Sequence, residues 1–106
     1  MENAILDVAF ELLLAREVCM DLARAYVDRD QVRIHELKRR FPGVSPEAVE
    51  AAYRSANELQ DVAITLADQH RSTGAAFDCD ILGARCPGFS MKSYAVAVND
   101  GYMMTR

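Results

Sequence analysis

The first two dozen residues combine a narrow polar stripe with a broad apolar arc, at the spacing of an amphipathic helix. The pattern predicts one long helix over residues 3 to about 28. A helix that rests on one neighbour needs an apolar arc of only about 100°, and this arc is broader. It therefore indicates contact with two elements or with a second copy of the chain. The polar stripe consists of Asp7, Glu11, Glu17, Asp21, Arg24 and Asp28.

The surplus apolar arc favours a homodimer. Leu14 interrupts the polar stripe and would be an exposed leucine in a monomer, and broad exposed apolar patches usually mark a contact. Cys19, on the apolar face, is expected to be a small core residue. The residues that we expect in the dimer interface are Leu6, Phe10, Leu13 and Leu14.

A helix end and a helix start lie close together in the middle of the chain. Pro42 ends the helix that precedes it, because the residue before a proline is disfavoured in the α region. Gly43 can adopt the left-handed conformation that closes a helix. Ser45 is a good N-cap, with Pro46 at the first helical position, where its missing N–H costs nothing. The segment predicts a tight helical corner.

The remaining pattern predicts a short helix over residues 31 to 40, a long one from 46 to about 71, and a last one from 91 to about 99. Repeated alanines on the long helix allow close backbone approach, so we expect it to lie antiparallel to the first helix. The predicted fold is all-α: a small helical bundle with two long antiparallel helices, a short helix and a C-terminal helix. Residues 1–106 are expected to form one domain.

The corner recurs 45 residues further along the chain. Leu, Arg, Pro, Gly and Ser occupy the same positions in Leu37–Ser45 and Leu82–Ser90. An apolar pair also spans each serine at the spacing of a hydrophobic staple, Val44 with Val49 and Phe89 with Tyr94. The shared residues are too few to claim a duplication. We interpret both corners as the same solution to one capping problem.

The chain is acidic overall, with a net charge of −4, but bases are concentrated in the short predicted helix. Arg33, Lys38, Arg39 and Arg40 could bind an acidic partner or nucleic acid. Alternatively, they complement the dipole at the helix C-terminus, with Glu36 pairing with Arg40. We take these four bases as the candidate partner-binding residues.

A helix-turn-helix DNA-binding regulator is the alternative function. The corner favours it, but Glu47 and Glu50 at the start of the second helix would be repelled by phosphates. Nucleic acid is therefore possible as a partner but disfavoured.

Residues suited to catalysis are scattered. His35 and His70 have no partner at i+3 or i+4 that would make a metal pair, and Cys79 and Cys86 have no histidine nearby. The sequence has no glycine-rich phosphate loop. We expect no enzymatic activity, no catalytic residues, no metal and no cofactor.

Neither a signal peptide nor a membrane span is expected. Glu2 stands where a basic leader segment would be, and charged residues interrupt the most apolar stretch. An odd number of cysteines without paired spacing is typical of reduced thiols. A cytoplasmic protein is expected.

The C-terminal region contains the segment Cys86–Ser90, followed by Ser93-Tyr94, Ala97, Asn99–Tyr102 and Thr105-Arg106. This pattern resembles the endings of small all-helical accessory proteins of Mu-like temperate phages and related mobile elements. The resemblance implies a cytoplasmic, non-enzymatic factor that binds a host or phage protein, sometimes as an inhibitor. Together with the broad apolar arc, it predicts a protein–protein interaction factor acting as a homodimer.

Overall fold

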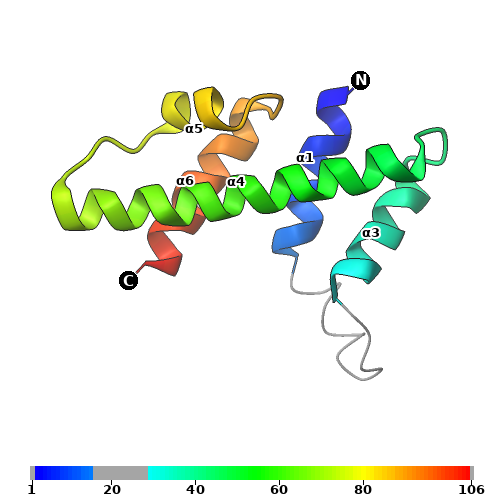
Figure 1. The fold of residues 1–106 in the computed structure, drawn as a ribbon, viewed down its shortest axis with the longest axis horizontal. Coiled ribbons are helices and arrows are strands. Elements are labelled where there is room, and N and C mark those ends of the chain that lie inside the picture. The colour runs from blue at the N-terminus through cyan, green and yellow to red at the C-terminus, as the bar shows by residue number, and fades with distance from the viewer. Residues whose placement is uncertain (1, 16–28, 106) are drawn as a thin grey trace. The chain divides into compact units, whose positions relative to one another are not determined.

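The regular elements of the described chain are all helices (Figure 1). The computed structural model describes residues 2–15 and 29–105, and no strand occurs in these ranges. The predicted all-α class is confirmed. The helices are α1 (Glu2–Leu14), α3 (Arg29–Arg40), α4 (Pro46–Thr73), α5 (Cys79–Arg85) and α6 (Met91–Met104).

The chain divides into two compact units, Met1–Ala56 and Asn57–Arg106, and α4 contributes to both. Each unit buries apolar side chains of its own. The expectation of a single domain over residues 1–106 stays a prediction. The largest fully buried side chains are Phe10, Leu37 and Val49 in unit 1, and Leu59 and Leu82 in unit 2.

The first helix of unit 1 is shorter than the sequence pattern predicts. It ends at Leu14, and Ala15 is not helical, although no proline or glycine stands nearby to end it. Residues 16–28, including Cys19, lie outside the described residues. A single helix from 3 to 28 is therefore not confirmed.

In unit 1, α1 lies next to α3 and the first part of α4. It packs against α3, where Ile34 and Leu37 are buried. In Figure 1, α1 crosses the first part of α4 rather than running along it. The expected antiparallel pair of long helices is not confirmed.

The two predicted corners share the same serine cap. The Oγ of Ser45 accepts a hydrogen bond from the N–H of Ala48 at 3.2 Å, and the Oγ of Ser90 accepts one from Ser93 at 3.3 Å. Both serines are therefore N-caps, as predicted. The corners differ at their glycines: Gly88 has a φ of 103°, but Gly43 does not adopt positive φ.

The end of α4 and the start of α5 are determined by residues directly beside them. α4 stops at Thr73, and Gly74 takes a left-handed φ of 74°, which closes the helix without a Cβ clash. In the irregular region that follows, Asp78 caps α5, because its carboxylate accepts from the N–H of Ile81 at 3.0 Å. This cap begins the short helix α5, Cys79–Arg85.

The last helix of unit 2 is longer than predicted, because Gly101 serves as a contact point rather than a stop signal. α6 continues to Met104. A Cβ added to Gly101 would lie 2.8 Å from the carbonyl oxygen of Ala63 on α4. Within unit 2, the two helices therefore cross with their backbones nearly touching, and only glycine fits there.

Candidate functional site

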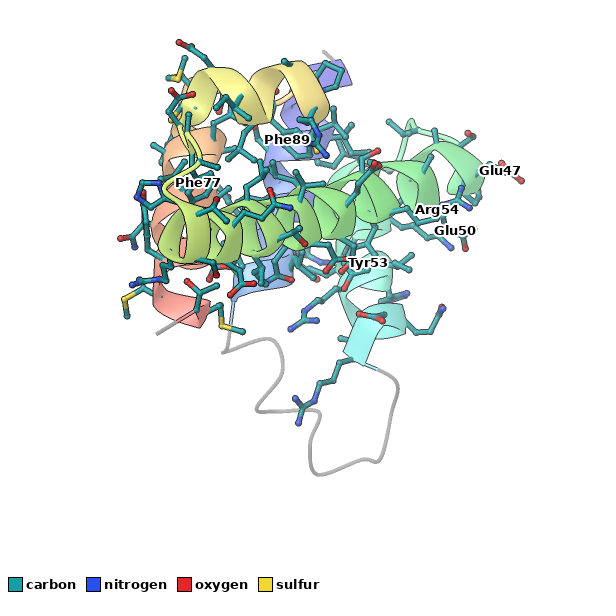
Figure 2. The ribbon with its side chains drawn as sticks, turned by 60° about the vertical axis from the view of Figure 1, so that its left-hand side comes forward. Glu47, Glu50, Tyr53, Arg54, Phe77 and Phe89 are labelled. Atoms are coloured by element: carbon teal, nitrogen blue, oxygen red, sulfur yellow. The ribbon has the colours of Figure 1, made fainter. Side chains whose placement is uncertain are left out.

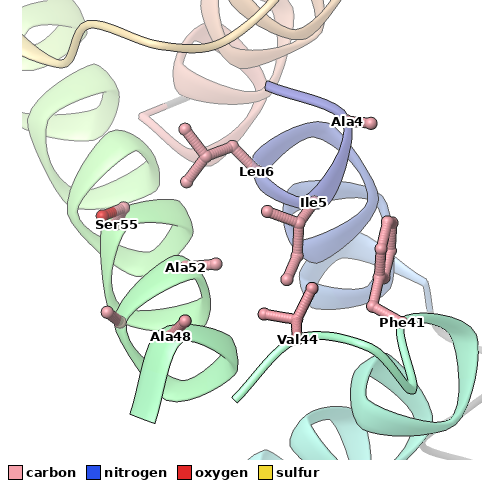
Figure 3. Close-up of a pocket in the computed structure, with 9 residues that line it drawn as sticks. Ala4, Ile5, Leu6, Phe41, Val44, Ala48, Ala52 and Ser55 are labelled. Atoms are coloured by element: carbon pink, nitrogen blue, oxygen red, sulfur yellow. The ribbon is translucent and has the colours of Figure 1, made fainter. Parts of the chain in front are cut away.

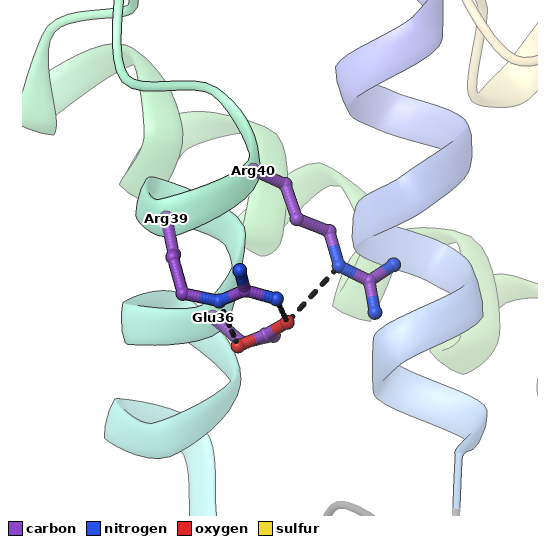
Figure 4. Close-up of polar contacts among 3 residues, drawn as sticks. All are labelled: Glu36, Arg39 and Arg40. Carbon is purple, nitrogen blue, oxygen red and sulfur yellow. Dashed lines mark hydrogen bonds and ion pairs between the residues drawn. The ribbon is translucent and has the colours of Figure 1, made fainter.

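The predicted basic residues lie on α3, and two of them are bound to one carboxylate. Arg39 donates two hydrogen bonds to Glu36, at 2.9 and 2.6 Å, and Arg40 donates one at 3.1 Å (Figure 4). The predicted pair of Glu36 with Arg40 is confirmed, and Arg39 makes the closer contact. This cluster is at the surface, where ion pairs contribute little to stability.

The cluster gives Glu36 an unusual acidity. The hydrogen bond from Arg39 has the largest effect and, with the smaller contribution of Arg40, lowers the pKa of Glu36 from 4.5 to about 2. Because the folded pKa lies below the unfolded one, any stabilisation is complete above about pH 4.5 and is lost as the pH falls toward 2.

We expect an NMR titration of the Glu36 carboxyl carbon to have its midpoint near pH 2. Arg39→Gln should move the midpoint back toward 4.5, because it removes the strongest hydrogen bonds to the carboxylate. Arg85→Gln, on an exposed residue of α5 in unit 2, is the matched control and should leave it unchanged. A wild-type midpoint near 4.5 would contradict the hydrogen-bonded geometry.

The other two predicted bases also face acids. Lys38 lies 3.9 Å from Glu50 on α4, and Arg33 lies 3.6 Å from Asp30. Arg33 is largely buried, with 14% of its side chain exposed, so its charge is poorly accessible to a partner. The four bases are brought to one helix, and an acidic side chain is close to each of them.

Tyr53 of α4 forms hydrogen bonds with two charged residues in the first part of α3. Its hydroxyl donates to Asp30 at 2.6 Å and accepts from Arg33 at 3.4 Å. Burial, and then the hydrogen bond to Asp30, raise the pKa of Tyr53 to about 12. The hydroxyl therefore stays protonated at neutral pH and holds the start of α3 against α4.

Unit 1 also contains an apolar groove, which the sequence pattern did not predict (Figure 3). Its volume is about 490 Å³, within the range of sites that hold a drug-sized ligand or large side chains. It lies between the start of α1, the corner after α3 and the first part of α4. Its lining residues are Ala4, Ile5, Leu6, Phe41, Val44, Ala48, Ala51, Ala52 and Ser55.

The α4 wall of the groove consists of small side chains at helical spacing. Ala48, Ala51, Ala52 and Ser55 follow the i, i+3, i+4, i+7 pattern of one helix face. Ala48 and Ala51 are exposed. The opposite wall carries the larger side chains Ile5 and Leu6. Ser55 supplies the one hydroxyl among the lining side chains, so the groove suits an apolar group.

The predicted dimer residues of α1 differ in accessibility. Phe10 and Leu13 are buried, with 1% and 8% of their surfaces exposed. Leu6 and Leu14 are partly exposed, and Leu6 lines the groove. Of the four, Leu6 is thus the one that an approaching partner would meet at this surface.

A smaller hollow of about 260 Å³ lies in unit 2. It combines apolar side chains with the charged groups of Asp61 and Arg85, and with Thr65 and Gln69. Its mixed lining does not select one class of ligand, whereas the groove of unit 1 does.

The surroundings of His70 and Cys86 favour structural roles for these two side chains. Nδ1 of His70 lies 2.8 Å from the carbonyl oxygen of Ala75, so Nδ1 carries the proton in that bond. Burial raises the pKa of the Cys86 thiol, and nearby Glu58 adds to the effect, which disfavours a reactive thiolate. No group of three or more potential metal ligands comes together among residues 2–15 and 29–105.

No protein-family model matches this chain, and no curated protein or solved structure does. Within the described residues, none of the helices has the length and apolar character needed to cross a membrane.

Proposed function

We propose that this protein is a non-enzymatic protein–protein interaction factor, and that the apolar groove of unit 1 is its contact surface. The observation that carries the proposal is the groove itself, a hollow of about 490 Å³ with alanines exposed on one wall. Filling such a hollow with apolar side chains is favourable by about 25 cal/mol for each Å² removed from water.

The charged cluster on α3 gives less support as a docking surface. Arg39 and Arg40 share the carboxylate of Glu36, and an acidic partner would have to compete with it. The same pairing gives no support to the DNA-binding alternative, because phosphates would meet guanidinium groups that already bind a carboxylate. We therefore place the partner at the groove.

The target that we propose is a protein. The resemblance to phage accessory proteins implies a host or phage protein, whose activity the chain would modulate or inhibit, and this stays part of the proposal. We expect the partner segment that binds the groove to have at least one large apolar side chain, because interfaces derive most of their affinity from a few such anchors.

Affinity capture with tagged protein tests the proposal. We expect Ala51→Lys to reduce the recovery of specific partners at least tenfold, because it places a charge on the exposed wall of the groove. Ala76→Lys adds the same charge in the exposed segment before α5 and should retain them. Recovery of the same proteins in the same amounts by both variants would overturn the groove as the contact surface.

A further inference from the structure

The charges beside the groove are arranged so that they match a second copy of the same surface. Glu47 and Arg54 stand on α4 at i and i+7, with Ala51 of the groove between them at i+4. These positions share one helix face. Figure 2 shows Glu47 and Arg54 projecting outward from the first part of α4, and both side chains belong to exposed residues.

Within one chain, Glu47 and Arg54 do not form an ion pair with each other. Seven residues along a helix correspond to about 10 Å of rise, more than the spacing of three or four residues at which ion pairs form on a helix surface. Neither residue has an ion-pair partner among residues 2–15 and 29–105. Glu50, on the same stretch, is near Lys38 instead.

We infer that the groove face of unit 1 binds a second copy of this chain through a two-fold axis near Ala51. In such an interface the same patch is used twice. If the two α4 helices run antiparallel across the axis, Glu47 of each copy faces Arg54 of the other. This inference rests on the proposed function and takes a second copy of the chain, in place of a host or phage protein, as the occupant of that same site.

The apolar groove and the charge pairs would have different roles in the dimer. Leu6 and Phe41 are the large, partly exposed side chains at the groove, and they are available to enter the groove of the second copy. Alanines on α4 let the two helices approach closely. Exposed ion pairs add little affinity but fix the register and reject wrong alignments.

Charge reversal at the two positions tests the pairing by sedimentation equilibrium of the full chain. We expect wild type to form dimers at micromolar concentration. Glu47→Arg and Arg54→Glu should each weaken the dimer at least tenfold, because each places like charges opposite one another. The double variant should recover most of the wild-type affinity, since it restores both pairs with reversed sign.

A mixture of the two single variants gives a second readout. Glu47→Arg carries two bases and Arg54→Glu carries two acids, so the mixture should form heterodimers although each variant alone is mostly monomeric. Circular dichroism checks that the variants keep their helices. Asp68→Arg, an exposed charge reversal farther along α4, is the control and should dimerise like wild type.

Two results would overturn the inference: a wild-type monomer at 100 micromolar, or a double variant that dimerises no better than the single ones. Capture of a different protein that Ala51→Lys abolishes, together with a wild-type monomer, would leave the proposed function standing and remove the second copy as the partner. If Ala51→Lys reduced neither dimerisation nor capture, the groove would be excluded both as the dimer interface and as the contact surface for another protein.

Discussion

Tyr94→Phe should lower the free energy of unfolding by about 2–4 kcal/mol, although it removes one oxygen atom. The hydroxyl of Tyr94 donates to the carbonyl oxygen of Cys86 at 2.7 Å and accepts from the N–H of Phe89 at 3.3 Å. Both bonds are buried. Loss of a hydrogen bond to a buried backbone group costs about 1–3 kcal/mol, and the 3.3 Å bond to Phe89 is the weaker of the two.

These two bonds hold the second corner closed. Cys86 follows the end of α5 and Phe89 precedes the cap of α6, so one side chain joins both sides of the turn. The rings of Phe89 and Tyr94 also meet edge to face, with centroids 6.0 Å apart. The predicted staple of these two aromatic residues therefore includes polar contacts that the spacing alone did not reveal.

Urea denaturation of Tyr94→Phe and Tyr102→Phe provides the measurement and its control. Tyr102 lies on the same helix and contacts its neighbours Phe77 and His70 through its ring, so removal of its hydroxyl should change stability by less than about 0.5 kcal/mol. Equal stability of the two variants would show that the hydroxyl of Tyr94 does not support the corner.

Local signals in the sequence were enough to predict the corners of the fold. Ser45 and Ser90 cap helices where the proline–glycine punctuation placed them, because a cap depends on residues only a few positions away. α4 ends at Thr73, near the predicted residue 71, and Gly74 with its positive φ stands just beyond the last helical turn. Short-range physics determines these boundaries.

Other helix ends depend on distant neighbours, and there the sequence misled. The last helix was predicted to end at about residue 99, yet α6 continues to Met104, and its Gly101 packs against the backbone of Ala63. In the first helix, no local signal marks the end at Leu14. A pattern of apolar positions cannot show which turn of a helix meets which neighbour.

The candidate site shows the same division. The pair of Glu36 with Arg40 was predictable, because residues four apart on a helix are neighbours. The bond between Tyr53 and Asp30 was not, since it joins two helices. The groove was also missed, because its walls come from three separate segments, and the repeated alanines of the long helix were interpreted as close packing against the first helix.

Gly101→Ala should destabilise the protein by about 1–3 kcal/mol. The added Cβ would lie 2.8 Å from the carbonyl oxygen of Ala63, 3.1 Å from its carbonyl carbon and 3.2 Å from the ring of Phe77. Two of these atoms are backbone and cannot turn aside, so α6 must move away from α4 within unit 2. Overpacking of this kind typically costs about 1–3 kcal/mol, and more when the backbone resists.

Helix propensity acts in the opposite direction, which makes Gly83→Ala the informative control. Alanine is better than glycine in a helix interior by about 1 kcal/mol. At Gly83 in α5 the new Cβ would meet the ring of Tyr94 at 3.6 Å, an ordinary contact. We therefore expect Gly83→Ala to be neutral or stabilising in the same urea titration. If both variants gained stability, α6 would not be pressed against the backbone of Ala63, and the long α6 would need another explanation.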